Sequence, residues 1–530
     1  MIRLSDHYEW VVLGDQPGAL LSGCLAAKLG LSVLILPVVE PFRLTVSQSG
    51  QFFDPETNSL LGLGGAGPSE GLVARCLFRS GMLASEAGLI RTYGVIPQVL
   101  TPNIRVAFGE ESGGWAQSLM REVGEKAVSG FGLLDALTKS EGRFWEFWRS
   151  LPDRLTVIDQ SPNKGSGKNA IKKSDQNFSL SADRLGVSDS RWVNHSKGVS
   201  ALFAKLPPLV QGALSEFSSG IWFGVSGFDH ADPVSFEMLQ MLALSKTGAS
   251  FKGGMTAYRQ FLLRLAQRLG AHVPDKAECG RVFVERGRLM GVQIAHRGNM
   301  ITVAGGALGC SLSEIRDRVV VDGENRPGKL KVSPTPTGWK FTVALTVRKE
   351  GVPPGITQRM VWSEIGAPGL EFEFADSADY GMRDDEHRVL YLRTTVPFTI
   401  ESLSTSFQRM LAARMFRQAT EILPFLEFHV TRIYPDFRAA LEVQSGDGLA
   451  DGLSGGDEFS AAFGFAMPAL VPSGLRVYSG EGVGVNSGIE GLFVTTNESY
   501  PKLGSLGPSV AALEAVAWAA HRNGLAGPFV

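Results

Sequence analysis

The sequence has few of the residues that build disulfide frameworks and metal sites. Its 530 residues include only 4 cysteines, and no two of them form a C-x-x-C pair. The 8 histidines show neither H-x-x-x-H nor H-E-x-x-H spacing, so we predict no metal site. The cysteines are predicted to be buried free thiols, as in proteins of a reducing compartment. They are Cys24, Cys76, Cys279 and Cys310.

An excess of charge of one sign is also absent. The chain has 51 Lys and Arg against 53 Asp and Glu, and its formal net charge is −2. A protein that binds nucleic acid through its phosphates needs an excess of basic residues, so we predict no nucleic-acid partner. There is no P-loop and no internal repeat. Two G-x-S-x-G strings, centred on Ser69 and Ser454, follow no predicted strand and so do not qualify as nucleophile elbows.

The N-terminus lacks the pattern of a secretion signal. Asp6 and Glu9 lie where a signal peptide has its basic region and apolar core. The range 11–39 is apolar over a length that suits a membrane helix, but Asp15 and Pro17 interrupt it near its start. We therefore expect a soluble, cytoplasmic protein.

What is present is ordinary for a large globular protein. Hydrophobic residues make up 44% of the chain and charged residues 20%. A chain of 530 residues is long enough for two or three domains with sizeable cores. The 63 glycines indicate many tight turns and close backbone approaches.

The first distinct pattern is a strand, a turn, a helix and a second strand. Residues 9–13 are a short apolar run of strand length, and residues 15–18 have the composition of a turn. Residues 19–29 suit a helix with small side chains for close packing on a sheet, and Gly30 follows as a C-cap. With the apolar strand 32–36 this predicts the first βαβ unit of a dinucleotide-binding fold.

The glycine pattern of this unit is only partly present. The expected G-x-G-x-x-G/A begins with Gly14 and ends with Ala19, but Gln16 stands at the second glycine. The acid expected after the second strand is replaced by Pro37, and Glu40, three residues on, is a candidate substitute. Two interpretations remain open, a dinucleotide site and a βαβ corner without a ligand.

The rest of the chain mixes helices with strands. Strand-like alternation of apolar and polar residues over 338–398 predicts an antiparallel sheet in a second domain. Phe144 and Trp148 belong to an aromatic cluster that is either core or the wall of an apolar substrate tunnel. The polar, basic range 161–177 is predicted to be a solvated loop, with phosphate binding as the alternative. Further helices are predicted at 72–82, 256–269, 407–422 and 509–522, and strands at 103–108, 271–273, 278–287, 288–294, 300–304, 307–310 and 491–496.

Three segments add a family resemblance to the βαβ unit. Residues 251–255, FKGGM, precede a predicted helix and resemble a P-x-G-G-M segment. The predicted hairpin around Cys279 resembles one that passes under a flavin adenine, and the range 497–508 resembles a second flavin motif. In their order along the chain, these segments are similar to flavin-dependent oxidoreductases of the phytoene desaturase and amine oxidase type.

The resemblance implies FAD as cofactor and assigns residues to it. In that family the residue at Cys279 contacts adenine through its backbone, and the acid at Glu498 holds the ribityl chain. A helix starting near Pro508 would direct its N-terminus at the flavin edge where negative charge collects. Gln16 and Asn497 depart from the family pattern. The implied cofactor residues are Gly14, Gln16, Pro17, Gly18, Ala19, Glu40, Gly254, Cys279, Asn497, Glu498, Gly504 and Gly507.

The resemblance also implies a fold and a function. The fold class is α/β, with a Rossmann-like FAD-binding domain around a central parallel sheet and a substrate domain with an antiparallel sheet and helices. The function is hydride transfer between flavin and a small apolar substrate, such as a polyene taken from or near a membrane surface. No catalytic residue is identified, and the oligomeric state is open. The FAD-binding domain would comprise 1–100, 251–320 and 476–530, and the substrate domain 101–250 and 321–475.

A second interpretation remains. Because Gln16, Pro37 and Asn497 all depart at positions facing the cofactor, the chain could be a relative with impaired catalysis. It would then act as a binding or scaffold protein, since fold alone does not fix function.

Overall fold

A computed structural model gives the fold of the protein. It describes residues 5–37, 46–48, 51–53, 59–64, 71–92, 98–107, 114–123, 200–227, 248–274, 277–295, 300–323, 330–354, 356–364, 367–376, 386–399, 402, 404–435, 475–478 and 482–525. Several predictions lie outside these residues: Glu40, the aromatic cluster 144–148, the loop 161–177, Ser69 and Ser454.

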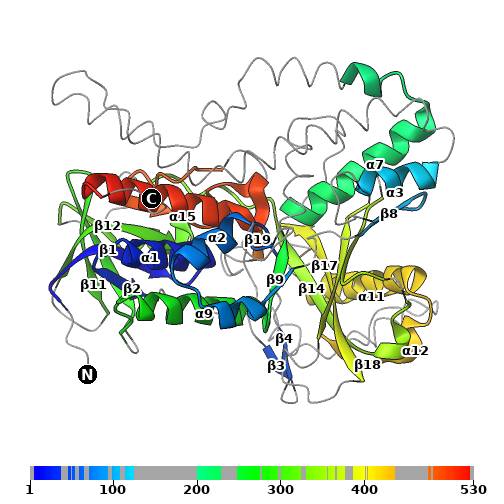
Figure 1. Ribbon diagram of the computed structural model, residues 1–530, viewed down its shortest axis with the longest axis horizontal. Coiled ribbons are helices and arrows are strands. Elements are labelled where there is room, and N and C mark those ends of the chain that lie inside the picture. The colour runs from blue at the N-terminus through cyan, green and yellow to red at the C-terminus, as the bar shows by residue number, and fades with distance from the viewer. Residues whose placement is uncertain are drawn as a thin grey trace.

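The first lobe is built around a seven-stranded sheet (Figure 1). Its centre is parallel, because β1 pairs in parallel with β2 and β12, and β12 with β20. The hairpin β10–β11 extends the sheet from β12, and β13 closes that side beside β10. The strands are β1 (His7–Gly14), β2 (Val33–Leu36), β10 (Cys279–Glu285), β11 (Arg288–Ile294), β12 (Met300–Gly309), β13 (Val319–Val321) and β20 (Leu492–Val494).

Strand β12 corrects the prediction of two separate strands in its range. Gly305 and Gly306 suggested a break, but the strand runs through both. A Cβ on Gly305 would lie 3.0 Å from the ring of Trp10. The pair of glycines therefore allows close approach of neighbouring elements and does not end the strand. The predicted strand 271–273 is reduced to a single bridge between His272 and Leu34.

Helix α1 (Pro17–Lys28) begins two residues earlier than predicted, because Pro17 suits the first helical turn. The helix packs between α15 (Gly507–Arg522) and α9 (Gly254–Arg268) and is buried along most of its length. Small residues allow this packing, since a Cβ on Gly23 would lie 3.0 Å from Val12. The first βαβ unit is thus enclosed by helices from the middle and the end of the chain.

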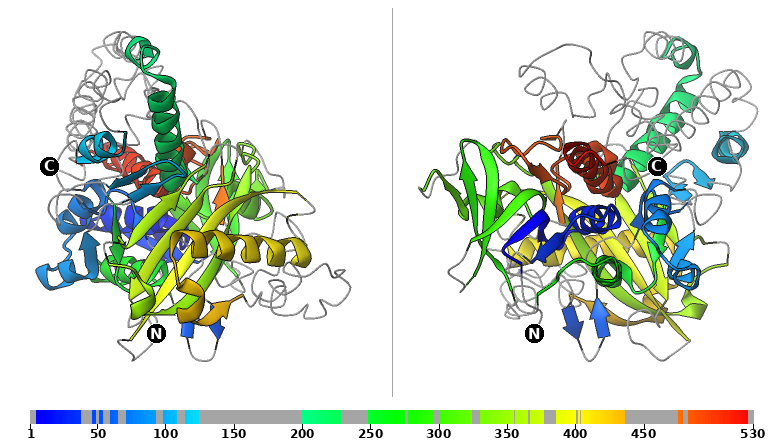
Figure 2. Two further views of the ribbon diagram at one scale, coloured as in Figure 1. Left: turned by 90° about the vertical axis from the view of Figure 1, so that its right-hand side faces the viewer. Right: turned by 60° about the vertical axis from the view of Figure 1, so that its left-hand side comes forward.

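The second lobe is built around an eight-stranded sheet, and α11 (Thr405–Ile422) lies across one face (Figure 2). The strands β14 to β17 are antiparallel, as the alternating pattern predicted. Strand β7 lies just N-terminal to residue 101, the predicted start of the substrate domain, and pairs in parallel with β15. The strands are β7 (Gln98–Leu100), β8 (Arg105–Ala107), β14 (Gly338–Arg348), β15 (Arg359–Trp362), β16 (Leu370–Asp376), β17 (His387–Pro397), β18 (Val430–Tyr434) and β19 (Arg476–Val477).

Smaller elements connect and cover the two sheets. A three-stranded sheet has the order β5-β9-β6, and β3 pairs with β4. These elements are β3 (Val46–Gln48), β4 (Gln51–Phe53), β5 (Ser59–Leu60), β6 (Ile90–Thr92), β9 (Ala249–Phe251), α2 (Leu72–Arg79), α3 (Gly114–Val123), α7 (Pro208–Ser226), α10 (Leu312–Arg316), α12 (Leu426–His429), η1 (Ala84–Leu89), η4 (Lys349–Gly351) and η9 (Pro501–Leu506).

One described segment is long and apolar enough to span a membrane. It is Pro501–Arg522, and 89% of its most apolar window is buried inside the protein. The segment therefore has the environment of a core helix, since it packs against α1 and the first sheet.

Candidate functional site

The turn between β1 and α1 packs closely against the end of β12. Gly14 has a φ of +110°, a conformation that favours glycine, and a Cβ there would strike the carbonyl oxygen of Gly309. The backbone N–H of Gln16 donates to that same oxygen at 3.3 Å. A Cβ on Gly309 would in turn lie 2.8 Å from the Cβ of Ala19. Gly14 and Ala19 therefore hold the carboxyl ends of two parallel strands against the first turn of α1.

Gln16 places a side chain at the position where the family pattern has none. The residue is only 7% exposed and precedes α1 without capping it through its side chain. Gln16 and Pro17 both line a cavity of the described residues. The side chain therefore occupies space at the N-terminus of α1, where the fold usually receives a diphosphate.

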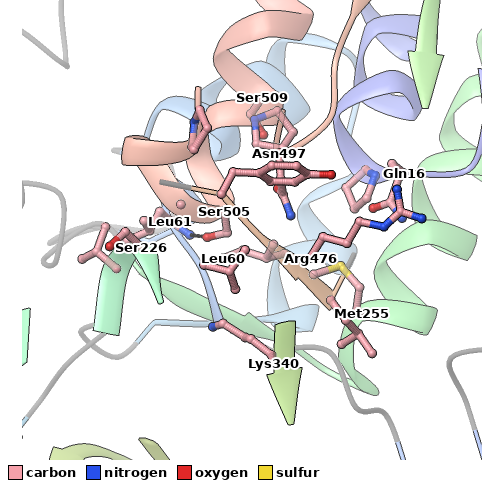
Figure 3. Close-up of a pocket in the computed structure, with 18 of the residues that line it drawn as sticks. Gln16, Leu60, Leu61, Ser226, Met255, Lys340, Arg476, Asn497, Ser505 and Ser509 are labelled. Carbon is pink, nitrogen blue, oxygen red and sulfur yellow. Dashed lines mark hydrogen bonds between the residues drawn. The ribbon is translucent and has the colours of Figure 1, made fainter. Parts of the chain in front are cut away.

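The cavity has a volume of about 100 Å³ and lies between the two lobes. Its walls come from the β1–α1 turn, the start of α15, α7, α9 and the strands β14, β15 and β19. In Figure 3, Asn497 and Ser509 lie at the top of the cavity and Lys340 reaches it from below. The lining residues are Gln16, Pro17, Leu60, Leu61, Val73, Gly224, Val225, Ser226, Met255, Tyr258, Lys340, Arg359, Leu475, Arg476, Val477, Tyr478, Asn497, Pro501, Gly504, Ser505, Pro508 and Ser509.

The C-terminal turn brings the start of α15 to this cavity. Gly504 has a φ of +53° and packs so closely on the carbonyl of Val225 that a side chain would not fit. The Ser505 hydroxyl accepts a hydrogen bond of 2.9 Å from the Leu61 backbone N–H. Gly507 starts α15, and Pro508 lines the cavity in its first turn. The positive end of the helix dipole is therefore directed at the cavity.

Glu498 lies beside this turn but does not line the cavity. Its carboxylate accepts hydrogen bonds from the Leu312 backbone N–H at 3.1 Å, the Ser333 hydroxyl at 2.8 Å and the Tyr478 hydroxyl at 3.1 Å. Burial raises the pKa of this carboxyl, and these three donors oppose the rise. Three hydrogen bonds leave this carboxylate capacity for a further donor, but Glu498 does not line the cavity, so the ribityl role assigned to it is not met by its present position.

Cys279 is buried at the start of β10, and its backbone N–H and carbonyl each already have a hydrogen-bond partner. Its N–H donates to the carbonyl of Pro37 at 3.1 Å, and its carbonyl accepts from the guanidinium of Arg318. These are the backbone groups that the resemblance assigned to adenine. All four cysteines are free and buried, as predicted, and burial raises the pKa of the Cys24, Cys76 and Cys279 thiols to about 12.

The predicted residues thus divide into two groups. Gln16, Pro17, Asn497 and Gly504 lie on the cavity wall. The others described shape the elements behind it, and Gly254 starts α9 next to the lining residue Met255. Among the described residues, no group of three or more His, Cys, Asp or Glu side chains suits a metal ion.

Sequence reasoning missed the polar residues contributed by the second lobe. Four of these residues line the cavity. They are Lys340 of β14, Arg359 of β15, Arg476 of β19 and Tyr478, which directly follows β19. A signal was available, because a lysine between Trp339 and Phe341 is unusual in an apolar strand. Only the three-dimensional arrangement brings these residues together.

Comparison with known proteins shows similarity in structure but not in sequence. No family model and no curated protein matches the sequence. An oxidoreductase from Methanosarcina mazei has a similar structure, with a TM-score of 0.52, 14% identity and coverage of 94% of this chain and 98% of that one. The chain has the fold of that oxidoreductase. The α/β fold predicted from the sequence is therefore confirmed.

Two weaker similarities extend over comparable lengths. A Rab GDI from Plasmodium falciparum has a TM-score of 0.48 and 8% identity, with 99% of each chain covered. A putrescine oxidase double mutant, made in a redesign of its cofactor binding, has a TM-score of 0.45 and 12% identity, with 96% of this chain and 99% of that chain covered.

The described residues fit the two ends of FAD differently. At the flavin end, the cavity offers the N-terminus of α15 and the polar side chains of Asn497 and Ser509, which suit the polar edge of a flavin ring. At the adenosine end, the backbone of Cys279 is already bonded and Pro37 carries no carboxylate. The flavin end therefore offers suitable polar groups, but in a cavity that at about 100 Å³ is smaller than a flavin ring needs. The adenosine would have to displace existing hydrogen bonds.

Proposed function

We propose that this chain is an FAD-dependent oxidoreductase that acts on a largely apolar substrate in the cavity between its lobes. The observation that carries the proposal is that one cavity joins the β1–α1 turn and the start of α15 to the face of the second sheet. Sites at the carboxyl ends of parallel strands are typical of this kind of fold. The similarity to phytoene desaturases noted in the sequence supports a hydride transfer to or from carbon.

In this proposal the protein binds and orients, and the cofactor supplies the chemistry. FAD supplies, when bound, a ring that takes up or gives two electrons. Asn497, Ser509 and the first N–H groups of α15 would hold the polar edge of the ring. Leu60, Val225 and other apolar lining residues would exclude water from the substrate. The FAD-binding domain would comprise 1–100, 251–320 and 476–530, as the sequence predicts, apart from β7 and β19, which pair within the second sheet.

A second function is favoured by the hydrogen bonds at the adenosine end. The Cys279 backbone is bonded to Pro37 and Arg318, and Glu498 is bonded to Leu312, Ser333 and Tyr478. A chain in which these bonds persist would bind FAD poorly. It would then be a binding or scaffold protein that holds an apolar ligand without redox turnover.

Flavin content separates the two functions. The purified protein should be yellow, or become so after incubation with FAD, and should release flavin when it is denatured. Protein that stays colourless after refolding with FAD would favour the binding-protein alternative.

The Gln16 side chain provides a sharper test of the same proposal. If it occupies the space of the diphosphate, Gln16→Gly should strengthen FAD binding by about tenfold, or ~1.4 kcal/mol. Isothermal titration with FAD measures this change. Asp15→Gly is the matched control, because it adds a glycine to the same turn without removing a side chain from the cavity wall. An equal gain in both variants would assign the effect to turn flexibility, and a loss in Gln16→Gly would show that Gln16 contributes to binding.

A further inference from the structure

The described walls of the cavity carry three cationic side chains and no carboxylate. The cations are Lys340, Arg359 and Arg476, and the N-terminus of α15 adds the positive end of a helix dipole. Most of the remaining lining side chains are apolar, including Leu60, Val225 and Met255. An uncharged apolar ligand gives such walls no electrostatic partner.

Of the three cations, Arg359 has the clearest shortage of hydrogen-bond partners. It is only 1% exposed, and its Nη2 atom is shared between the Glu371 carboxylate at 2.9 Å and the Gly224 carbonyl at 3.2 Å. Its Nε and Nη1 atoms are buried and have no hydrogen-bond partner. Two unpaired guanidinium donors are costly in a folded protein. These two atoms are not themselves exposed to the cavity, so an acceptor bound there would pair with them only after a small shift of the Arg359 side chain.

Lys340 adds a second cation that is only loosely paired. Its Nζ lies 3.7 Å from Glu371, which is beyond hydrogen-bond distance, and its side chain is 16% exposed. Burial lowers the pKa of this lysine, and the nearby carboxylate of Glu371 opposes that shift. Glu371 also lies 3.5 Å from Arg393, which forms an ion pair with Glu373 as well, so the cluster holds three cations and two carboxylates. The described residues thus leave positive charge at the cavity wall without full compensation.

We propose that the ligand of this cavity is an amphipathic carboxylate, whose anionic group lies at Arg359 and Lys340 and whose apolar body lies along the remaining walls. Carboxylate and guanidinium form charge-assisted hydrogen bonds, which are stronger than neutral ones in a buried site. The inference names the substrate class of the proposed oxidoreductase and in that sense rests on it. The binding that it predicts does not depend on flavin.

Matched ligands test the proposal. Octanoate and 1-octanol share one apolar chain and differ in charge, and isothermal titration of the full-length protein measures both. Octanoate should bind at least about tenfold more tightly than octanol. Lys340→Met should lower octanoate affinity by about five- to tenfold and leave octanol unchanged. Lys349→Met is the control, because Lys349 follows β14 directly but is exposed and lies outside the cavity.

Arg359→Met should abolish the preference for octanoate. Because this change also removes a partner of Glu371, circular dichroism and the melting temperature must first show that the variant is folded. If Arg359→Met is not folded, the comparison of Lys340→Met with Lys349→Met tests the proposal by itself. Equal affinity for octanoate and octanol, or equal losses in the two lysine variants, would overturn the proposal.

Titration with FAD separates this proposal from the proposed function. If Lys340→Met weakens FAD but not octanoate, the cations serve the cofactor and the carboxylate proposal is wrong. If the protein binds no FAD but prefers octanoate through Lys340, the oxidoreductase proposal fails and the carboxylate site stands.

Discussion

Gly18 lies where three segments of the chain meet. A Cβ at this position would lie 2.5 Å from the Thr495 carbonyl oxygen, and 2.6 and 2.7 Å from the carbonyl oxygen and the Cβ of Pro508. None of these atoms can move without shifting the backbone of β20 or α15. The absence of a side chain at Gly18 therefore sets how closely α1 approaches the C-terminal helix.

Gly18→Ala is expected to lower the free energy of unfolding by about 1–3 kcal/mol through overpacking. Urea denaturation followed by circular dichroism measures the change. Gly212→Ala is the matched control, since Gly212 is also helical but has no atom within 4 Å of its would-be Cβ. That control should be neutral or stabilising by up to about 1 kcal/mol. A Gly18→Ala variant as stable as the control would contradict the packing described here.

Gly14 and Gly18 also show how much of the site can be predicted from the sequence. The G-x-G-x-x-G/A pattern identified Gly14, and the composition of a turn identified Gly18. That composition placed Gly18 in a turn, whereas the residue is in the first turn of α1. The partners Thr495 and Pro508 are almost 500 positions away in the sequence, and no local pattern specifies a contact over that separation.

At the scale of elements, neighbouring strands of the second sheet carry their charges on one face. Glu371 of β16 lies opposite Arg393 of β17, and Glu373 lies opposite Arg359 of β15. The alternation within each strand was predictable from the sequence, but the register between strands was not. The charged cluster exists only because the register aligns these residues, so the sequence predicted the sheet and missed the cluster.

Glu371 should give this sheet a defined acid sensitivity. Burial raises the pKa of its carboxyl, but Arg359, Lys340 and Arg393 outweigh burial and hold the pKa at about 2. The folded pKa is thus below the unfolded value of about 4.3. The ionised carboxylate stabilises the fold above about pH 4.3, and this stabilisation is lost as the pH falls toward about 2.

Glu371→Gln should therefore reduce the free energy of unfolding by about 3 kcal/mol at pH 7, since it leaves buried cations uncompensated. Urea denaturation at a series of pH values should show the difference from the unmodified protein shrinking below about pH 4.3. Glu364→Gln, an exposed position near the same strands, serves as the control and should change little. A constant difference across this pH range would mean that Glu371 does not titrate as described.

At the scale of the whole molecule, Arg476 connects the two lobes. It lies on β19, which pairs with β14 of the second sheet. Its guanidinium donates to the Ser311 hydroxyl at 3.1 Å and pairs with Glu314 at 3.1 Å, both at the start of α10 in the first lobe. A side chain that is only 4% exposed thus holds a strand of one lobe to a helix of the other.

Arg476→Met is expected to lower stability by about 3 kcal/mol and to weaken the coupling between the lobes. Differential scanning calorimetry should then show two partly separated transitions or a broadened one. Arg316→Met, on the exposed face of α10, is the control and should leave the transition unchanged. A single sharp transition in Arg476→Met would show that other contacts couple the lobes.

The position of α1 between α9 and α15 has a consequence for synthesis of the chain. The first helix is complete by residue 28, but α9 can cover it only after residue 268 has been made, and α15 only after residue 522. Until then the growing chain carries a hydrophobic helix that is only partly covered, which favours aggregation. Productive folding should therefore depend on chaperones that hold the nascent N-terminal segment. Slower translation of the codons between α9 and α15 should lower the yield of soluble protein.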